Sequence, residues 1–363
     1  MENATNTTIE IDGHKIAADQ PVYFIADIGA NHDGDIERAK DLIWKAAEAG
    51  AHAAKFQHFS ADTIVSDYGF KSLGTQMSHQ SKWNKSVYEI YDSASLDTSW
   101  TTTLKETCDD AGITFFTSPY SKSLVDHVDP YVPAYKIGSG DITWLGIIDH
   151  ILSKGKPVLL ATGASNFVDV EQAMQVIRAK TEEVVLMQCN TNYTANIENF
   201  KFINLNVLKE FKRQFPEVIL GLSDHTPGHT TVLGAVALGA RVIEKHFTDS
   251  CEREGPDHKF AMDPQAWRKM VEATRELEYA LGDGVKRVEG NELETSVLQR
   301  RCLRATKTLS EGDKIGVGDF VPLRPCVESA IGPSDELNVV GMQLTKAFAK
   351  GQELKWEDVK TAL

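Results

Sequence analysis

Eight short apolar runs alternate with helical patterns between residues 22 and 281, and this rhythm constrains the fold more than any other feature. The runs occupy residues 22–26, 51–56, 114–116, 134–137, 158–161, 184–187, 218–222 and 241–244. Strands that alternate with helices pair in parallel through right-handed connections, and eight such units close naturally into a barrel. The sequence therefore predicts an α/β fold of the (β/α)8, or TIM-barrel, type.

The clearest helical pattern lies between the first two runs. Apolar residues three or four apart, from Ile36 to Ala47, share one helix face, and Gly50 follows as a C-terminal stop. Comparable patterns occupy residues 101–111, 168–179, 205–214, 229–239 and 264–281. A dinucleotide-binding Rossmann fold is disfavoured, because no Gly-x-Gly-x-x-Gly motif follows the first run.

Three segments fall outside the barrel rhythm. Residues 8–16 alternate around Asp12-Gly13, a turn pair typical of a β-hairpin, and we expect this hairpin to close the barrel from below. Residues 60–96 form a long insertion, of the kind that covers an active-site face. Beyond residue 285 the composition changes, which predicts a barrel domain at 1–285, a linker at 286–301 and a small β-rich domain at 302–363.

Charge and cysteine usage exclude several classes of protein. The chain carries 38 basic and 52 acidic residues, a formal net charge of -14, which argues against nucleic-acid and anionic-membrane partners. Its five cysteines are odd in number and widely spaced, so no disulfide framework is indicated. The polar N-terminus resembles no secretion signal, and no run approaches the roughly 18 apolar residues of a membrane span. We expect a cytoplasmic enzyme.

Candidate functional residues follow from the predicted barrel. In barrel enzymes the reactive side chains lie at the carboxyl ends of the strands. The residues at those positions are Asp27, Asn31, His32, Lys55, Gln57, Ser118, Lys136, Ser139, Asp141, Thr162, the segment 189–193, Ser223, His225 and His246.

Two lysines in this set, Lys55 and Lys136, point to an anionic ligand. A buried ammonium group is costly unless a negative charge meets it, and phosphate is one such partner. The nearby hydroxyls of Ser118, Ser139 and Ser223 favour phosphate. Pairing of each lysine with a carboxylate, such as Asp27 or Asp141, is the alternative.

Two histidines end neighbouring predicted strands and form a candidate metal site. The imidazoles of His225 and His246 can converge on one ion and leave open positions for a substrate oxygen, which suits Mn²⁺, Mg²⁺ or a similar divalent ion. Each histidine taken alone is more typical of a satisfied polar residue. Asp257, in the loop after the eighth run, is either a turn residue or a partner for sugar hydroxyls.

At these positions the chain resembles the N-acetylneuraminate (sialic acid) synthase family, which includes legionaminate and pseudaminate synthases. The resemblance covers almost the whole chain, in the family's order. Its carriers are Ala-Asp-Ile-Gly-Ala-Asn-His at 26–32, Lys-Phe-Gln at 55–57, Ser-Pro-Tyr-Ser at 118–121, Ala-Tyr-Lys-Ile-Gly-Ser-Gly-Asp at 134–141, Gly-Leu-Ser-Asp-His-Thr at 221–226, Glu-Lys-His-Phe-Thr at 244–248 and Gly-Pro-Asp-His at 255–258.

The resemblance implies a reaction between phosphoenolpyruvate (PEP) and an open-chain N-acetylated hexosamine, with a role for each site residue. Two carboxylates and two lysines would be catalytic: Asp27, Asp141, Lys55 and Lys136. PEP would contact Lys55, Ser118, Lys136, Ser139, Thr191 and Ser223, and the sugar would contact Asn31, Gln57, Tyr193, Asp257 and Arg324. The divalent metal on His225 and His246 would be Mn²⁺, with Mg²⁺ and Co²⁺ as alternatives.

The C-terminal part is similar to the antifreeze-like (SAF) module of that family. In such enzymes the module acts across a domain-swapped homodimer, and by position Arg324 would reach the partner's sugar site. The chain departs from the family's usual pattern at Asp27 and Asp141, where glutamate is usual, and at Thr194, where proline is usual. These departures leave the acceptor open among N-acetylmannosamine, its 6-phosphate and a 2,4-diacetamido-trideoxy hexose.

Two other functions remain as alternatives at the level of the sequence. One is another PEP-using synthase of 3-deoxy sugar acids, a class whose barrels lack a C-terminal module of this kind. The other is a catalytically silent sugar-binding protein that has kept the fold, because a fold alone does not establish a function.

Overall fold

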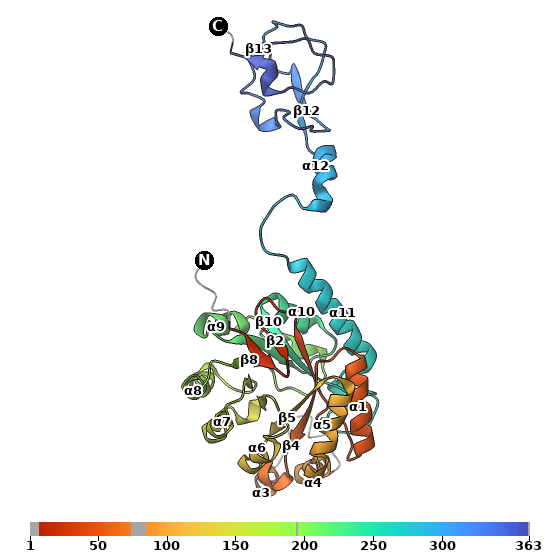
Figure 1. The fold of residues 1–363 in the computed structure, drawn as a ribbon, viewed down its shortest axis with the longest axis vertical. Helices are drawn as coiled ribbons and strands as arrows, with labels where there is room; N and C mark the ends of the chain where they lie inside the picture. The colour runs from red at the N-terminus through yellow and green to blue at the C-terminus, as the bar shows by residue number, and fades with distance from the viewer. Residues whose placement is uncertain (1–6, 74–84, 194, 362–363) are drawn as a thin grey trace. The chain divides into compact units, whose positions relative to one another are not determined.

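The computed structural model describes residues 7–73, 85–193 and 195–361 of the chain. The chain divides into two compact units, Met1–Gly282 and Asp283–Leu363, which are described separately (Figure 1). Thr194, one of the departures from the family pattern, lies outside the described residues.

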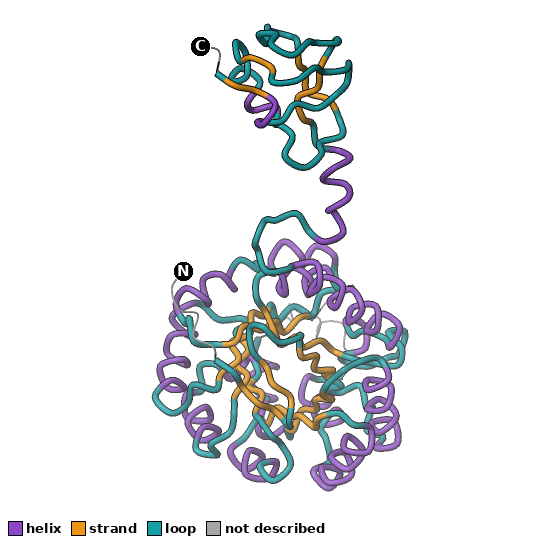
Figure 2. The backbone as a smooth tube through the Cα atoms, turned by 45° about the horizontal axis from the view of Figure 1, so that its top comes forward, coloured by secondary structure: helices purple, strands orange, loops and turns teal. Residues whose placement is uncertain are grey.

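The first unit is the predicted barrel, with helices around a ring of strands (Figure 2). Its eight parallel strands follow the order β5-β4-β3-β10-β9-β8-β7-β6, and β5 and β6, at the two ends of this order, lie next to each other. The strands are β3 Tyr23–Asp27, β4 Ala53–His58, β5 Thr114–Pro119, β6 Tyr135–Ile137, β7 Val158–Ala161, β8 Val184–Cys189, β9 Ile219–Asp224 and β10 Ala240–His246. The predicted fold class is confirmed.

Several strands continue beyond the apolar runs that predicted them. β10 runs on to His246, and β9 runs on to Asp224. Apolar periodicity marks only the apolar part of a strand. The last residues of a barrel strand are polar, because they line the open end of the barrel, but they keep the backbone pairing of the strand. Several residues singled out from the sequence, namely Asp27, Gln57, Ser118, Ser223 and His246, therefore lie on the strands themselves, where the backbone ladder fixes their positions.

The expected helices are present: α1 Ile36–Glu48, α5 Thr101–Ala111, α8 Phe167–Arg178, α9 Val207–Gln214, α10 Thr230–Ala237 and α11 Pro264–Leu281. Helix α1 begins where the Asp35 side chain accepts the backbone N–H groups of Glu37 and Arg38. Two further helices were not predicted, α6 Lys122–Val128 and α7 Leu145–Leu152. Helix α6 is short, whereas α7 has a helical pattern that was overlooked: its residues 147, 148, 151 and 152 are buried, and Gly146 and Asp149 are exposed.

The lower half of the barrel interior is an apolar core that the N-terminal hairpin covers. The hairpin pairs β1 Ile9–Ile11 with β2 His14–Ile16, and its turn has Asp12 at φ 51° and Gly13 at φ 78°, in the left-handed region. Its three isoleucines join a buried cluster with inward-facing strand residues such as Ile25 and Phe116. The predicted hairpin is confirmed, and it lies at the end of the barrel opposite to the carboxyl ends of the strands.

The insertion after β4 contains three short helices in its described part: α2 Ala61–Ile64, α3 Asp67–Ser72 and α4 Val87–Ala94. The hydroxyl of Tyr88 donates to the Asp62 carboxylate and joins α4 to α2. This pair of helices forms part of the cavity wall described below.

The second unit begins with α12 Leu293–Gln299 and continues as short strands. Strand β11 Cys302–Ala305 pairs antiparallel with β12 Phe320–Leu323, and β13 Gln343–Leu344 pairs with β14 Val359–Lys360. Leu303, Phe320 and Phe348 belong to its own apolar core. The expected β-rich character is confirmed, while the likeness to an antifreeze-like module stays a prediction.

All five cysteines are free thiols, as their spacing predicted. Within the described ranges, no helix combines the length and the apolar character needed to cross a membrane.

Candidate active site

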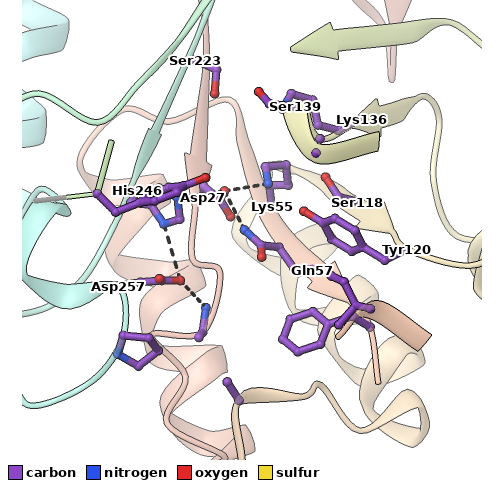
Figure 3. A pocket seen from close by; sticks show the side chains of 18 of the residues that line it. Asp27, Lys55, Gln57, Ser118, Tyr120, Lys136, Ser139, Ser223, His246 and Asp257 are labelled. Atoms are coloured by element: carbon purple, nitrogen blue, oxygen red, sulfur yellow. Dashed lines mark hydrogen bonds and ion pairs between the residues drawn. The ribbon is translucent and has the colours of Figure 1, made fainter. Parts of the chain in front are cut away.

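A cavity of about 390 Å³ opens at the carboxyl ends of the barrel strands (Figure 3). It brings together thirteen of the residues singled out from the sequence. They are Asp27, Lys55, Gln57, Ser118, Lys136, Ser139, Asp141, Cys189, Tyr193, Ser223, His225, His246 and Asp257.

Strand pairing explains why these side chains meet. His246 on β10 lies beside Asp27 on β3, and Asp27 lies beside Lys55 on β4. Glu244 precedes His246 by two positions and lies beside Ser223 on β9. Because residues two apart on a strand face the same side, Glu244 and His246 both point into the barrel.

Four buried charges occupy the floor of the cavity, two lysines and two carboxylates. Lys55 Nζ lies 2.7 Å from Asp27 Oδ2 and 3.9 Å from Glu244 Oε2, and Lys136 Nζ lies 3.1 Å from Glu244 Oε1. Their side chains are between 2% and 5% exposed. We call these four residues the charge quartet; their formal charges sum to zero.

The neighbours in the charge quartet hold each other ionised. Burial alone would raise the pKa of Asp27 and of Glu244, but the adjacent lysines lower both below their ordinary values. Burial opposes the charge of Lys55, yet Asp27 and Glu244 raise the pKa of that ammonium group. At neutral pH these three groups therefore carry their charges.

Asp27 is bonded on both carboxylate oxygens. Its Oδ1 accepts the backbone N–H of Gly29 at 3.0 Å, and its Oδ2 accepts the Gln57 amide at 3.2 Å besides pairing with Lys55. His246 Nε2 lies 3.5 Å from the same Oδ2. The Asp27 carboxylate, on a side chain one methylene shorter than the usual glutamate, is thus fixed in place close to Lys55.

The sequence offered Asp27 and Asp141 as carboxylate partners of the two lysines, and the structure shows a different pair. Lys55 does pair with Asp27, but Lys136 pairs with Glu244 rather than with Asp141. Glu244 was missed as a site residue. Its position two residues before His246 on one strand is the signal that would have found it, because both side chains must face the interior.

The two histidines lie side by side, with ring centroids 5.4 Å apart. His225 Nδ1 donates to the backbone carbonyl of Asn190 at 2.9 Å, which fixes the ring and leaves Nε2 available as a ligand atom. Burial and the neighbouring His246 lower the pKa of His225 to about 4, so it is neutral at physiological pH. His246 Nδ1 is buried and has no hydrogen-bond partner among the described residues.

This donor set fits a divalent ion held by two imidazoles with other positions open to oxygen ligands. Among the described residues, no group of three or more His, Cys, Asp or Glu side chains is arranged to hold a metal.

Asp141 differs from the carboxylates of the charge quartet. It lies in the short helix η3 Ser139–Asp141 after β6, and no ion pair joins it to another residue in the described parts of the chain. Burial raises the pKa of its carboxyl group to about 6. This group can exchange a proton near neutral pH, whereas Asp27 stays ionised.

Two of the serines that line the cavity differ in their contacts. Ser118 Oγ is buried and has no hydrogen-bond partner within the described residues. Ser139 Oγ accepts the backbone N–H of Gly163 at 3.0 Å, and a Cβ at Gly163 would lie 2.9 Å from it. Only glycine fits at this contact without a shift of the surrounding side chains.

Three predicted site residues are not in the cavity wall. Asn31 is buried, and its side-chain amide donates to the Phe247 carbonyl at 2.9 Å. Thr191 lies against Gly163, next to the lining residues. Arg324 is exposed on the second unit. Besides Glu244, sequence reasoning also missed Tyr120 and Tyr91, which line the cavity.

The fold and the cavity define the chain as an α/β-barrel enzyme. The model of the NeuB family matches residues 42–286, and the chain belongs to this family. Comparisons with individual proteins agree.

N,N'-diacetyllegionaminic acid synthase from Legionella pneumophila is 33% identical over 344 residues, covering 93% of this chain and 94% of that protein. Human N-acetylneuraminate-9-phosphate synthase is 27% identical, over 92% of this chain and 91% of that protein. The crystal structure of N-acetylneuraminic acid (sialic acid) synthetase from Leptospira borgpetersenii superposes with a TM-score of 0.69 at 27% identity, covering 80% of this chain and 95% of that chain.

The charge quartet makes a prediction about stability. Glu244→Gln leaves Lys136 buried beside a neutral partner, so the free energy of unfolding should fall by about 3–5 kcal/mol in urea titrations. Inorganic phosphate should raise the unfolding temperature of this variant more than that of the parent, because the variant has an uncompensated cation. Glu210→Gln, which removes an exposed pair with Arg213, is the control and should change little. Equal losses in both variants would contradict the prediction.

Proposed function

We propose that this protein condenses PEP with an open-chain N-acetylated amino sugar to give a nonulosonic acid and inorganic phosphate. The observation that carries the proposal is the pair of buried lysines with serine hydroxyls at the mouth of a NeuB-family barrel. Relatives named as legionaminic acid and N-acetylneuraminate-9-phosphate synthases support the same class of reaction.

The lysine side of the cavity is proposed to bind PEP. Lys55 and Lys136 supply positive charge, and Ser118, Ser139 and Ser223 supply hydroxyl donors around it. In the charge quartet both lysines are already paired with carboxylates. A phosphate that enters the site therefore adds hydrogen bonds, and neither lysine is an unpaired buried cation in its absence. Thr191, behind Gly163, is proposed to support this end of the site.

We propose that His225 and His246 hold a divalent ion, Mn²⁺ or alternatively Mg²⁺ or Co²⁺. The fixed ring of His225 and the buried Nδ1 of His246, which makes no hydrogen bond to the described residues, support this assignment. The ion, when bound, supplies Lewis-acid polarisation to a carbonyl oxygen.

The reaction forms one carbon–carbon bond and one carbon–oxygen bond, the latter to water, and breaks the carbon–oxygen bond between PEP and its phosphate. Carbon 3 of PEP attacks the sugar aldehyde, whose oxygen takes up a proton, and water then adds to the cationic carbon 2. Asp141 is proposed to accept the proton of that water, since its pKa of about 6 suits a general base, while Asp27 stays ionised and stabilises the positive charge. The tetrahedral intermediate expels phosphate together with the bridging oxygen.

The remaining walls are proposed to select the acceptor. Gln57, Tyr193 and Asp257 offer polar contacts, whereas the insertion supplies an apolar wall of Phe59, Ile64, Ile90, Tyr91 and Ala94. The rings of Phe59 and Tyr91 lie 5.5 Å apart. Burying a phosphate or several hydroxyls against such a wall is unfavourable, while acetamido and deoxy methyl groups gain about 0.8 kcal/mol per buried carbon. The wall favours a 2,4-diacetamido-trideoxy hexose.

Arg324 is proposed to act in a partner subunit's sugar site, within a domain-swapped homodimer. Its exposure leaves the guanidinium available, and its several N–H donors suit the carbonyl of an N-acyl group.

The proposed reaction is tested with PEP, Mn²⁺ and three acceptors: N-acetylmannosamine, its 6-phosphate and the diacetamido-trideoxy hexose. We expect phosphate release with the last as the best substrate by kcat/KM, a nine-carbon 2-keto acid by mass spectrometry, and loss of activity on chelation. Oxygen-18 in the bridge of PEP should appear in phosphate. A 3-deoxy sugar acid formed only from a sugar lacking nitrogen would favour another PEP-using synthase, and no turnover with any acceptor would favour a silent sugar-binding protein.

The second prediction concerns pH. Asp141 must be ionised to act as a base, so kcat/KM should fall as pH drops through about 6 and stay level above it. Asp141→Asn should lower the rate and remove this acidic limb. Asp126→Asn, at an exposed position, should leave the limb in place. A limb with an unchanged midpoint in Asp141→Asn would refute the assignment.

The third prediction concerns Arg324. Lys136→Ala and Arg324→Ala should each be inactive alone, but subunit exchange between them should restore activity toward half of the parent value per heterodimer. In such a heterodimer one site carries both lesions and the other is intact, provided that the arginine acts in trans. Absence of any recovery, with heterodimers verified by native mass spectrometry, would indicate action within one subunit.

A further inference from the structure

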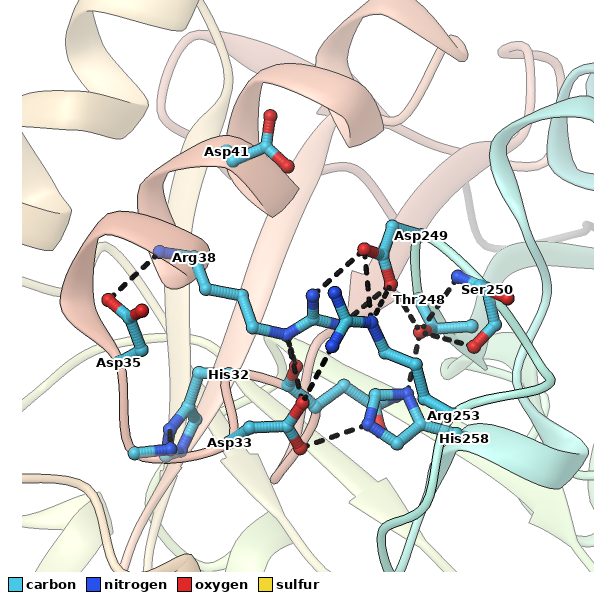
Figure 4. Close-up of polar contacts among 12 residues, drawn as sticks. His32, Asp33, Asp35, Arg38, Asp41, Thr248, Asp249, Ser250, Arg253 and His258 are labelled. Carbon is cyan, nitrogen blue, oxygen red and sulfur yellow. Dashed lines mark hydrogen bonds and ion pairs between the residues drawn. The ribbon is translucent and has the colours of Figure 1, made fainter.

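A network of buried and half-buried charges joins two loops at the rim of the barrel (Figure 4). At its centre Arg38, on α1, makes a two-pronged pair with Asp249: Nη1 lies 2.8 Å from Oδ2, and Nη2 lies 2.6 Å from Oδ1. The side chains are 10% and 18% exposed. This fork-to-fork geometry requires the planar guanidinium of arginine.

The third nitrogen of the guanidinium faces the loop after β3. Arg38 Nε donates to the backbone carbonyl of Asn31 at 2.7 Å and lies 3.1 Å from Asp33 Oδ2. Arg38 thus connects the loop of residues 28–35 with the loop of residues 247–263, which carries Asp249. A strong pair with Arg38 lowers the pKa of Asp249, so the contact persists at acidic pH.

The same two loops meet again inside the cavity, at Asp257. The backbone N–H of Ala30 donates to Asp257 Oδ2 at 3.1 Å, and His246 Nδ1 lies 3.8 Å from the same oxygen. A Cβ at Gly29 would lie 2.7 Å from this oxygen, so the loops leave no room for a larger residue there. The neighbouring His258 is fixed by Asp33 at 3.0 Å and by Thr248 at 2.7 Å.

From this double contact we infer that Arg38 is a positioning residue for the acceptor: by clamping the two loops together at the rim, it holds Asp257 beside Ala30 and His246 in the cavity. The inference rests on the proposed function, in which Asp257 contacts the acceptor. Arg38 does not line the cavity, so its effect must pass through the loops. PEP, at the lysine side, should be little affected.

The inference is tested by a double-mutant cycle. Arg38→Gln in the otherwise unchanged enzyme should raise the acceptor KM about 10-fold and change the PEP KM less than about 2-fold. In an Asp257→Asn background the same change should alter the acceptor KM less than about 2-fold, because the group that Arg38 positions is already lost. Arg38→Lys should recover little, since an ammonium group cannot form the two-pronged pair.

Two controls separate positioning from general stability. Arg275→Gln removes another half-buried arginine, which donates to the Val22 carbonyl near the other end of β3, and it should lower the unfolding temperature without raising the acceptor KM. Asp249→Asn breaks the clamp from its other side and serves as a second variant should Arg38→Gln not fold.

Equal fold-changes of Arg38→Gln in both backgrounds, or an equal rise in the PEP and acceptor KM values, would overturn the inference. An inactive parent enzyme with every acceptor would instead overturn the proposed function, so the two failures are distinguishable.

Discussion

Neutralisation of two buried lysines is the constraint on which the site depends. Lys55 and Lys136 project into a cavity floor where an unpaired ammonium group would be strongly unfavourable, and Asp27 and Glu244 remove that cost. The barrel makes this possible because parallel strands in fixed register bring β3, β4, β6 and β10 to one ring. An anionic ligand entering this floor meets charges that are already ordered, which limits the reorganisation that binding requires.

The two ends of the barrel interior differ in polarity: the hairpin end is apolar, and the carboxyl ends of the strands form the polar cavity. The hairpin and the lower strand residues form an apolar plug, while the upper strand ends carry the charge quartet and the two histidines. Asp27 illustrates how a shorter carboxylate fits this arrangement: with both oxygens bonded, it is committed to Lys55 and to Gly29. Asp141, in a less restrained position, keeps a pKa near neutrality. The two aspartates, one at the end of β3 and one after β6, thus differ in pKa because their surroundings differ.

Much of the fold and part of the site could be predicted from the sequence. Strand and helix positions followed from periodicity, and the strand-end rule found both lysines, the paired histidines and Asp141. Glu244 was missed although it ends the predicted run 241–244, because its pairing with Lys136 depends on strand register, and helix α7 was missed although its buried residues have helical spacing. Asn31 follows a strand end as expected, but its side-chain amide donates to the Phe247 carbonyl and not into the cavity.

The sequence by itself determined the barrel, the polar residues at its mouth and the family resemblance, since these depend on periodicity and residue type along the chain. Only the tertiary structure decided which charges pair. Lys136 and Glu244 are 108 residues apart in sequence. Over such a separation no local signal distinguishes Glu244 from the other carboxylates. The same holds for Arg38 and Asp249, which are 211 residues apart. Pairing depends on strand register and loop packing, and these are set by the closure of the whole barrel rather than by any local pattern.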